Sequence, residues 1–236
     1  MKRHKVVYNS GEGEIVEKKS RFIATVRPVK TEEEAVLFID EMKKKYWNAT
    51  HNCSAYVLGL NNEIMRCSDD GEPAQTAGRP MLDVLIGEEI RNVCVVVTRY
   101  FGGTLLGTGG LVRAYSKSVQ EGLAGCDIIE KIPADRVDID CDYTLVGKLQ
   151  YLIAQEGITV LDTVYTDKVN MSIMIPVEDT DSVIGKITEA VNAKAGINKN
   201  GQMYYALLGK EVLLLCAEHG TNLAGASPVT GIYRQV

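Results

Sequence analysis

Three carboxylates and an arginine lie close together in the stretch 67–80, which reads CSDDGEPAQTAGRP. Asp69, Asp70 and Glu72 fall within four consecutive positions, and Arg79 follows seven residues after Glu72. Such a cluster can bind a divalent metal ion, act as general acid and base, or form a charged turn. A divalent ion needs several converging oxygens, and this loop supplies at most part of the shell. Spacing alone leaves the three alternatives open.

A histidine and a cysteine stand two residues apart just upstream, in the sequence HNC. On a strand, His51 and Cys53 point to the same face, so they can form half of a metal site or a nucleophile with its base. The chain has no C-x-x-C pair, and its only other histidines are His4 and His219. A zinc centre needs more ligands than these. We therefore expect a partly buried, satisfied His51, with no metal and no cofactor.

A glycine-rich turn, RYFGGTLLGTGGLVRAYS, joins an apolar run to an amphipathic segment. Backbone amides at the start of a helix favour an anion, so a phosphate can bind at residues 108–110. The turn is not a P-loop, because no Gly-Lys-Ser/Thr follows, and it lacks the G-x-G-x-x-G spacing of dinucleotide sites. The alternative is structural: glycines permit a tight connection with positive φ.

Hydrophobic periodicity and turn signals indicate the elements that position these residues. Thr31 and Glu34 form the pattern of a capping box at the start of a helix. From the N-terminus we predict strands within 13–29, a helix over 31–46, a hairpin over 53–68 that turns at Asn61 and Asn62, a short helix within 79–90, a buried strand within 92–101 and a helix over 111–125.

The second half of the chain repeats strand, helix, strand, strand, helix. The helices are predicted at 142–156 and 179–192, and a last strand near 202–208 completes the split βαβ pattern of a ferredoxin-like domain. We therefore divide the chain into residues 1–132, 133–209 and a tail, 210–236, whose structure the sequence does not indicate. The linker around Pro133 is expected to be open to proteases.

Composition limits the class of protein. The 236 residues are 45% hydrophobic and 24% charged, as in ordinary globular proteins, and the formal net charge is −5. This charge argues against wholesale nucleic-acid binding, although a local basic patch is compatible with it. Six scattered cysteines, no apolar run of membrane-spanning length and no hydrophobic signal segment indicate a cytoplasmic protein without a membrane association.

Two long motifs carry a family resemblance. CSDDGEPAQTAGRPML followed by VVVTRYFGGTLLGTGGLVRAYS closely resembles the YigZ/Impact family, and HNCSAYVLG fits its upstream strand. The match covers roughly residues 13–124, and the second half looks like the bacterial C-terminal extension of the family. Gln75 stands where a glycine is expected, and the tail beyond Gly209 exceeds the usual length.

The resemblance implies an α+β protein. Its N-terminal domain would have the β-α fold of ribosomal protein S5 domain 2, and its C-terminal domain would be ferredoxin-like, similar to the last domain of elongation factor G. Eukaryotic members regulate translation by competing for the activator of the amino-acid-starvation kinase. The resemblance therefore associates the family with a stress response. Bacterial members have no established reaction, and their structures have suggested nucleic-acid binding.

Carried over by position, the family motifs suggest one binding groove, in which the acidic loop lies against the glycine-rich turn and Arg79, Arg99 or Arg113 offsets its charge. His51 and Cys53 would support the groove. Its proposed residues are Asp69, Asp70, Glu72, Arg79, Arg99, Tyr100, Gly102, Gly103, Gly107, Gly110 and Arg113.

The leading functional interpretation is a non-enzymatic, translation-associated regulatory module that binds RNA or a ribosome-associated protein. One alternative is a small metal-dependent hydrolase or nuclease that uses the acidic loop. Another is a scaffold that binds protein only. The sequence identifies neither the partner nor the oligomeric state.

Overall fold

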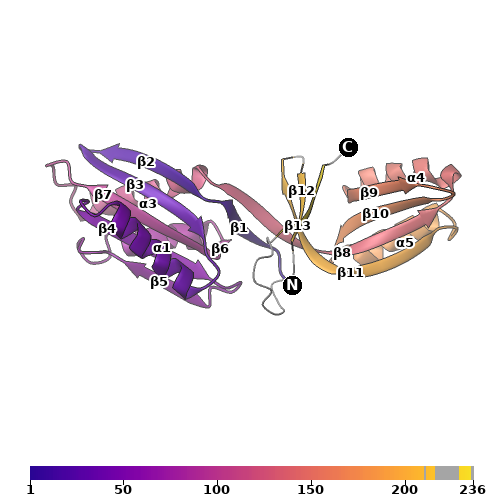
Figure 1. The fold of residues 1–236 in the computed structure, drawn as a ribbon, viewed down its shortest axis with the longest axis horizontal. Helices are drawn as coiled ribbons and strands as arrows, with labels where there is room; N and C mark the ends of the chain where they lie inside the picture. The colour runs from indigo at the N-terminus through magenta and orange to yellow at the C-terminus, as the bar shows by residue number, and fades with distance from the viewer. Residues whose placement is uncertain (210, 216–228, 235–236) are drawn as a thin grey trace. The chain divides into compact units, whose positions relative to one another are not determined.

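The computed structural model describes residues 1–209, 211–215 and 229–234, so that Cys216 and His219 lie outside the described residues. Two compact units are formed by residues 4–129, the N-terminal domain, and by residues 1–3 with 130–236, the C-terminal domain (Figure 1). This boundary falls three residues before the one expected from the sequence. Within the described part of the chain, no helix is both long and apolar enough to cross a membrane.

The N-terminal domain is built on a five-stranded antiparallel sheet. Its order is β2-β3-β7-β4-β5, and outside this sheet β1 pairs with β6 in parallel. In chain order the elements are β1 (His4–Asn9), β2 (Gly11–Glu17), β3 (Ser20–Pro28), α1 (Glu32–Lys45), β4 (His51–Leu58), β5 (Ile64–Ser68), α2 (Gly78–Gly87), β6 (Ile90–Arg91), β7 (Val93–Tyr100) and α3 (Thr108–Ala124).

The central strand β7 is buried on both faces. Val93, Val95 and Val97 belong to the core under α2 and α3, whereas Cys94 and Val96 pack with α1 on the opposite face. Side chains alternate along a strand, so this two-sided burial explains the uninterrupted apolar run from which the strand was predicted. The domain therefore has three layers, with α1 on one side of the sheet and α2 and α3 on the other (Figure 1).

The predicted start of α1 is confirmed. The Thr31 side chain accepts a hydrogen bond from the backbone amide of Glu34 at 3.2 Å. The Glu34 carboxylate accepts from the amide of Lys30 at 2.7 Å, one residue earlier than in the standard capping box. Acidic residues in the first turn and lysines in the last complement the helix dipole.

The C-terminal domain has the predicted ferredoxin-like topology. Strands β9-β10-β8-β11 form an antiparallel sheet, and the buried side chains of α4 and α5 pack on one of its faces. The elements are β8 (Asp127–Cys141), α4 (Tyr143–Gln155), β9 (Thr159–Tyr165), β10 (Val169–Pro176), α5 (Thr180–Ala190) and β11 (Gly196–Leu208). Both predicted helices are confirmed to within two residues at each end.

The described parts of the tail add two strands to this sheet. β12 (Glu211–Leu215) pairs with β11, and β13 (Val229–Arg234) pairs with β12. Val212 and Leu214 pack with Met174 and Tyr205 in a small second core. Neither these strands nor β1 was predicted from the sequence.

The expected open linker around Pro133 is wrong. Residues 127–141 form the single strand β8, in which Ile132 pairs with Tyr205 and Pro133 with Tyr204 of β11. The backbone on both sides of Pro133 is thus held within a sheet, and a sheet-bound backbone resists cleavage because a protease needs several residues to become extended and free.

We predict that trypsin cleaves after Lys131 and Arg136 more slowly than after Lys18 and Lys19, which are exposed in the turn between β2 and β3. Mass spectrometry of the early fragments of limited digestion measures the order of cleavage. Early release of two stable fragments cut at Lys131 would show that β8 does not protect this boundary.

Candidate functional site

Three side chains form a row across the middle of the N-terminal sheet. Phe22 on β3 and His51 on β4 are both direct cross-strand neighbours of Arg99 on β7. Because alternate residues of a strand share a face, Arg99 points to the same side as Val95 and Val97, which α2 and α3 cover. The strand register thus places a cation beside the helix layer that is otherwise apolar.

Glu72 from the acidic loop neutralises this cation. Arg99 Nη1 donates to Glu72 Oε1 at 2.5 Å, and the Tyr115 hydroxyl of α3 donates to the same oxygen at 2.8 Å. The Arg99 and Glu72 side chains are only 6% and 3% exposed. Burial, above all, raises the pKa of Tyr115, so its hydroxyl keeps its proton and remains a donor. The expectation that an arginine offsets the acidic loop is confirmed for Arg99.

Asp69 binds backbone amides rather than a ligand. Its Oδ1 accepts from Ala77 and Gly78, at 3.0 and 2.8 Å, and its Oδ2 accepts from Gln75 at 2.8 Å. These amides lie at or just before the start of α2, which has Ala77 at its N-cap position and no side-chain hydrogen bond from the cap residue itself. Asp69 therefore supplies the cap from eight residues upstream.

Asp70 faces the opposite layer. Its Oδ1 pairs with Lys43 Nζ of α1 at 2.7 Å, and its Oδ2 accepts from the backbone amide of Asn52 at 2.7 Å. The φ angle of Asp70 is 43°, in the left-handed region that aspartate tolerates. The two adjacent carboxylates thus point apart.

His51 and Cys53 hold the backbone of the same loop. The Asp70 carbonyl lies 2.8 Å from His51 Nδ1, and since a carbonyl only accepts, Nδ1 carries a proton. The Cys53 thiol donates to the Asp69 carbonyl at 3.0 Å. Burial, above all, raises the pKa of Cys53 to about 12, so the residue is a protonated thiol at neutral pH and a poor nucleophile. A partly buried, hydrogen-bonded His51 was expected.

The glycine-rich turn closes over this cluster through Ser20. Ser20 Oγ accepts from the Gly102 amide at 3.1 Å and lies 3.5 Å from Arg99 Nη2. A Cβ on Gly102 would lie 2.0 Å from the backbone of Lys19, so only glycine fits. Gly103 and Gly107 have φ angles of 82° and 72°, which supports the structural interpretation of this turn.

The remaining residues of the expected groove lie elsewhere. Arg79 pairs with Asp83 on the exposed face of α2 at 2.8 Å. The hydroxyl of Tyr100 donates to Asn48 at 3.0 Å. Arg113 and Gly110 line a separate hollow beside α3. Some residues of the sequence motifs therefore form one buried cluster, and others lie outside it at the surface.

The carboxylates of this cluster make their hydrogen bonds within the protein. Asp69 and Asp70 are engaged by amides and a lysine, and Glu72 by Arg99 and Tyr115. Among the residues that the structure describes, no three His, Cys, Asp or Glu side chains converge to hold a metal ion. His51 Nε2 lies 3.9 Å from Glu72 Oε2, and the His51 side chain is 19% exposed.

Comparison with known proteins identifies the family. A model described as the Impact N-terminal domain matches residues 18–123, and a domain of unknown function, DUF1949, matches residues 139–194. The chain is 44% identical over 199 residues to the IMPACT family member YvyE of Bacillus subtilis (strain 168), a match that covers 84% of this chain and 91% of YvyE. This chain belongs to the IMPACT family.

Two further relatives of this IMPACT chain agree. It is 33% identical over 174 residues to the family member YigZ of Escherichia coli (strain K12), which covers 73% of this chain and 85% of YigZ. A crystal structure titled only as a hypothetical protein is 29% identical, covers 84% of this chain and 97% of that chain, and superposes with a TM-score of 0.53. The expected α+β class and the two-domain fold of the family are thus confirmed.

The departure from the IMPACT motif at Gln75 has a conformational explanation. Gln75 has a φ angle of 63°, a region in which a side chain is strained and glycine is not. The amide of Gln75 still donates to Asp69. The glycine expected from the motif fits this backbone conformation, and the close approach of the loop survives without it.

Several residues of the cluster were missed by the sequence analysis. Tyr115, Ser20 and Lys43 complete the contacts of Glu72, Gly102 and Asp70 from elements distant in sequence. Tyr115 lies within the longer family motif, and its place on the buried stripe of α3 was the available signal. Nothing local marks Ser20 or Lys43.

We predict that Glu72→Gln lowers the free energy of unfolding by about 3–5 kcal/mol, because it leaves the buried Arg99 guanidinium uncompensated. The double variant Glu72→Gln with Arg99→Met should recover most of this loss. Urea unfolding followed by circular dichroism measures both effects. Glu14→Gln, which breaks the exposed pair with Arg21, is the matched control and should cost much less. Equal losses in the two single variants would contradict the buried-pair argument.

We predict that Gln75→Gly raises the free energy of unfolding by about 0.5–1 kcal/mol, because it removes the strain of a side chain at positive φ. Gln75→Ala keeps a Cβ and should give no such gain. The same urea titration compares the two variants. Equal stabilisation by alanine would place the cause outside the backbone conformation.

Proposed function

We propose that this chain is a non-enzymatic, translation-associated binding module whose N-terminal domain contacts RNA. The role in translation is supported by membership of the IMPACT family, whose eukaryotic members the resemblance associates with translational regulation. The observation that carries RNA contact is a basic hollow beside the glycine-rich turn.

This basic hollow has a volume of about 250 Å3 and lies between β2 and the first turns of α3. Lys18, Arg113 and Lys117 supply three exposed cations, against the single carboxylate of Glu17. Gly110 also lines it, in the first turn of α3, where amides lack partners within the helix. Clustered cations beside such amides suit a phosphate oxygen.

Phe101 supplies a surface for an unpaired base. Its side chain is 46% exposed at the start of the turn, and an exposed aromatic ring can stack on a base. Tyr100 is less available because its hydroxyl is bonded to Asn48. Arg99, a residue of the expected groove, is buried against Glu72, so the proposal assigns phosphate contact to Arg113 and the two lysines.

The sheet of the C-terminal domain is less suited to RNA. The face opposite α4 and α5 carries Asp138 and Asp140 on β8, bonded to Ser172 and Asn170 of β10. Ferredoxin-like RNA-binding domains stack bases on aromatic residues of the two central strands. Carboxylates at those places repel phosphate, so the proposal assigns RNA contact to the N-terminal domain.

The metal-dependent hydrolase or nuclease receives less support. Such a site needs carboxylate oxygens that are free to coordinate. Both oxygens of Asp69 accept from backbone amides. Glu72 Oε1 accepts from Arg99 and Tyr115, and the Glu72 side chain is only 3% exposed. In this proposal the cluster supports the fold.

We predict that the chain binds an unstructured single-stranded RNA at low salt, as measured by retention of the RNA on a filter. Binding should fall steeply as salt is raised, and EDTA should have no effect on it. Arg113→Glu with Lys117→Glu should weaken binding more than about tenfold, a loss of about 1.4 kcal/mol. Arg79→Glu with Lys44→Glu changes the net charge equally on exposed helix surfaces and should have a much smaller effect.

Circular dichroism of each variant first establishes that the fold is intact. Absence of RNA binding at low salt, loss of binding with EDTA, or equal weakening by the two charge-reversed variants would overturn the RNA proposal. The last outcome would mean that only net charge matters.

A further inference from the structure

The strand β5 is an unpaired edge of the N-terminal sheet. In the sheet order β2-β3-β7-β4-β5 it has β4 on one side and no strand on the other, and four of its five residues are exposed. An edge strand presents unpaired amides and carbonyls that can pair with a further strand. Natural proteins often protect such edges with charged side chains. Arg66 is the only charged residue of β5, so this edge has little protection of that kind.

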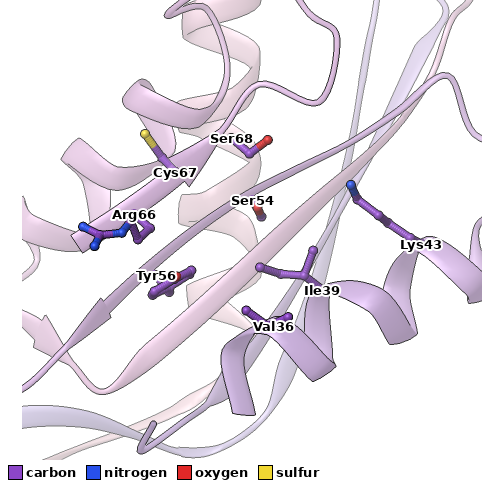
Figure 2. A pocket seen from close by; sticks show the side chains of 8 residues that line it. All are labelled: Val36, Ile39, Lys43, Ser54, Tyr56, Arg66, Cys67 and Ser68. Atoms are coloured by element: carbon purple, nitrogen blue, oxygen red, sulfur yellow. The ribbon is translucent and has the colours of Figure 1, made fainter. Parts of the chain in front are cut away.

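A hollow of about 260 Å3 accompanies this edge on the face covered by α1 (Figure 2). Val36 and Ile39 of α1 form one wall, and Tyr56 of β4 with Arg66 and Ser68 of β5 forms the other. Most ligand pockets are larger, about 300–1,000 Å3. The hollow is better matched to one or two apolar side chains that descend from a segment lying along the edge.

Charge narrows the kind of segment. The lining contains two cations, of which Lys43 is already paired with Asp70 at 2.7 Å, so Arg66 is the one that remains for a partner. Arg66 lies 3.7 Å from Glu32 and its side chain is 63% exposed, so the guanidinium can reach a second carboxylate. A segment that places a carboxylate opposite Arg66 is therefore favoured at this edge.

We propose that the groove formed by β5 and α1 binds an extended, acidic segment of a partner protein by β-strand addition. The main chain of the segment pairs with β5, an apolar side chain fills the hollow between Val36, Ile39 and Tyr56, and a carboxylate pairs with Arg66. Backbone pairing supplies affinity and the alternating side chains supply specificity. This site is distinct from the basic hollow and does not rest on RNA binding.

The probe is a library of random linear peptides displayed on phage and selected on the full chain. Selected peptides should combine Asp or Glu with alternating apolar, β-branched residues. Val36→Trp fills the hollow from a position 45% exposed, so the fold should tolerate it, and it should weaken binding of a selected peptide more than about tenfold. Leu37→Trp, on the same helix and 68% exposed, does not line the hollow and is the control.

Arg66→Glu should weaken the same peptide more than about tenfold, whereas Arg79→Glu, with a side-chain exposure of 61% against 63%, should not. Methylation of single peptide amides should weaken binding at alternate positions only, as strand pairing requires. Circular dichroism checks every variant.

Failure to select peptides on the natural chain beyond those selected on Val36→Trp would overturn the proposal. Insensitivity to amide methylation would exclude strand addition. A dimer in sedimentation equilibrium that Val36→Trp dissociates would instead assign the groove to a second copy of this chain.

Discussion

The buried pair between Glu72 and Arg99 is the interaction on which the N-terminal domain depends. Arg99 is fixed by its place on β7, and once its guanidinium is enclosed under α3 it must meet a carboxylate. Glu72 can supply one only if the loop before α2 folds back over the sheet. Other contacts hold that carboxylate in place. They are made by the side chains of Asp69 and Asp70, and by His51 and Cys53, which bond to the backbone of the loop.

Such a pair is weak evidence for stability but a strong constraint on conformation. Alternative folds of the loop would leave a charge buried without a partner, which costs far more than the pair itself contributes. This accounts for the density of charged residues around Gly71 and Pro73. Asp69 and Asp70 order the loop through their bonds to backbone amides and to Lys43. They help to position the Glu72 carboxylate without contacting it.

Much of the fold could be predicted because its signals are local. The apolar run of β7, the cap at Thr31 and the alternation of strands and helices after Pro133 each depend on neighbouring residues. The pairing of β1 with β6, about eighty-five positions apart, has no local signal. Burial of Arg99 was missed for the same reason, since the residue stands between the apolar run and the glycine-rich turn and its partner lies 27 positions away. The family motifs included Asp69, Asp70, Glu72 and Arg99 of the cluster. Tyr115, Ser20 and Lys43 were missed, and the motifs did not distinguish a supporting role from a contact surface.

Asp69 and Asp70 are consecutive, yet they serve opposite faces of one sheet. The first carboxylate caps α2, and the second pairs with Lys43 on α1, whose side chain also lines the groove beside β5. One planar peptide bond therefore connects the two helical layers around an edge of the sheet. The contacts of α1 and of the start of α2 are therefore joined by a covalent route two residues long that does not pass through the hydrophobic core.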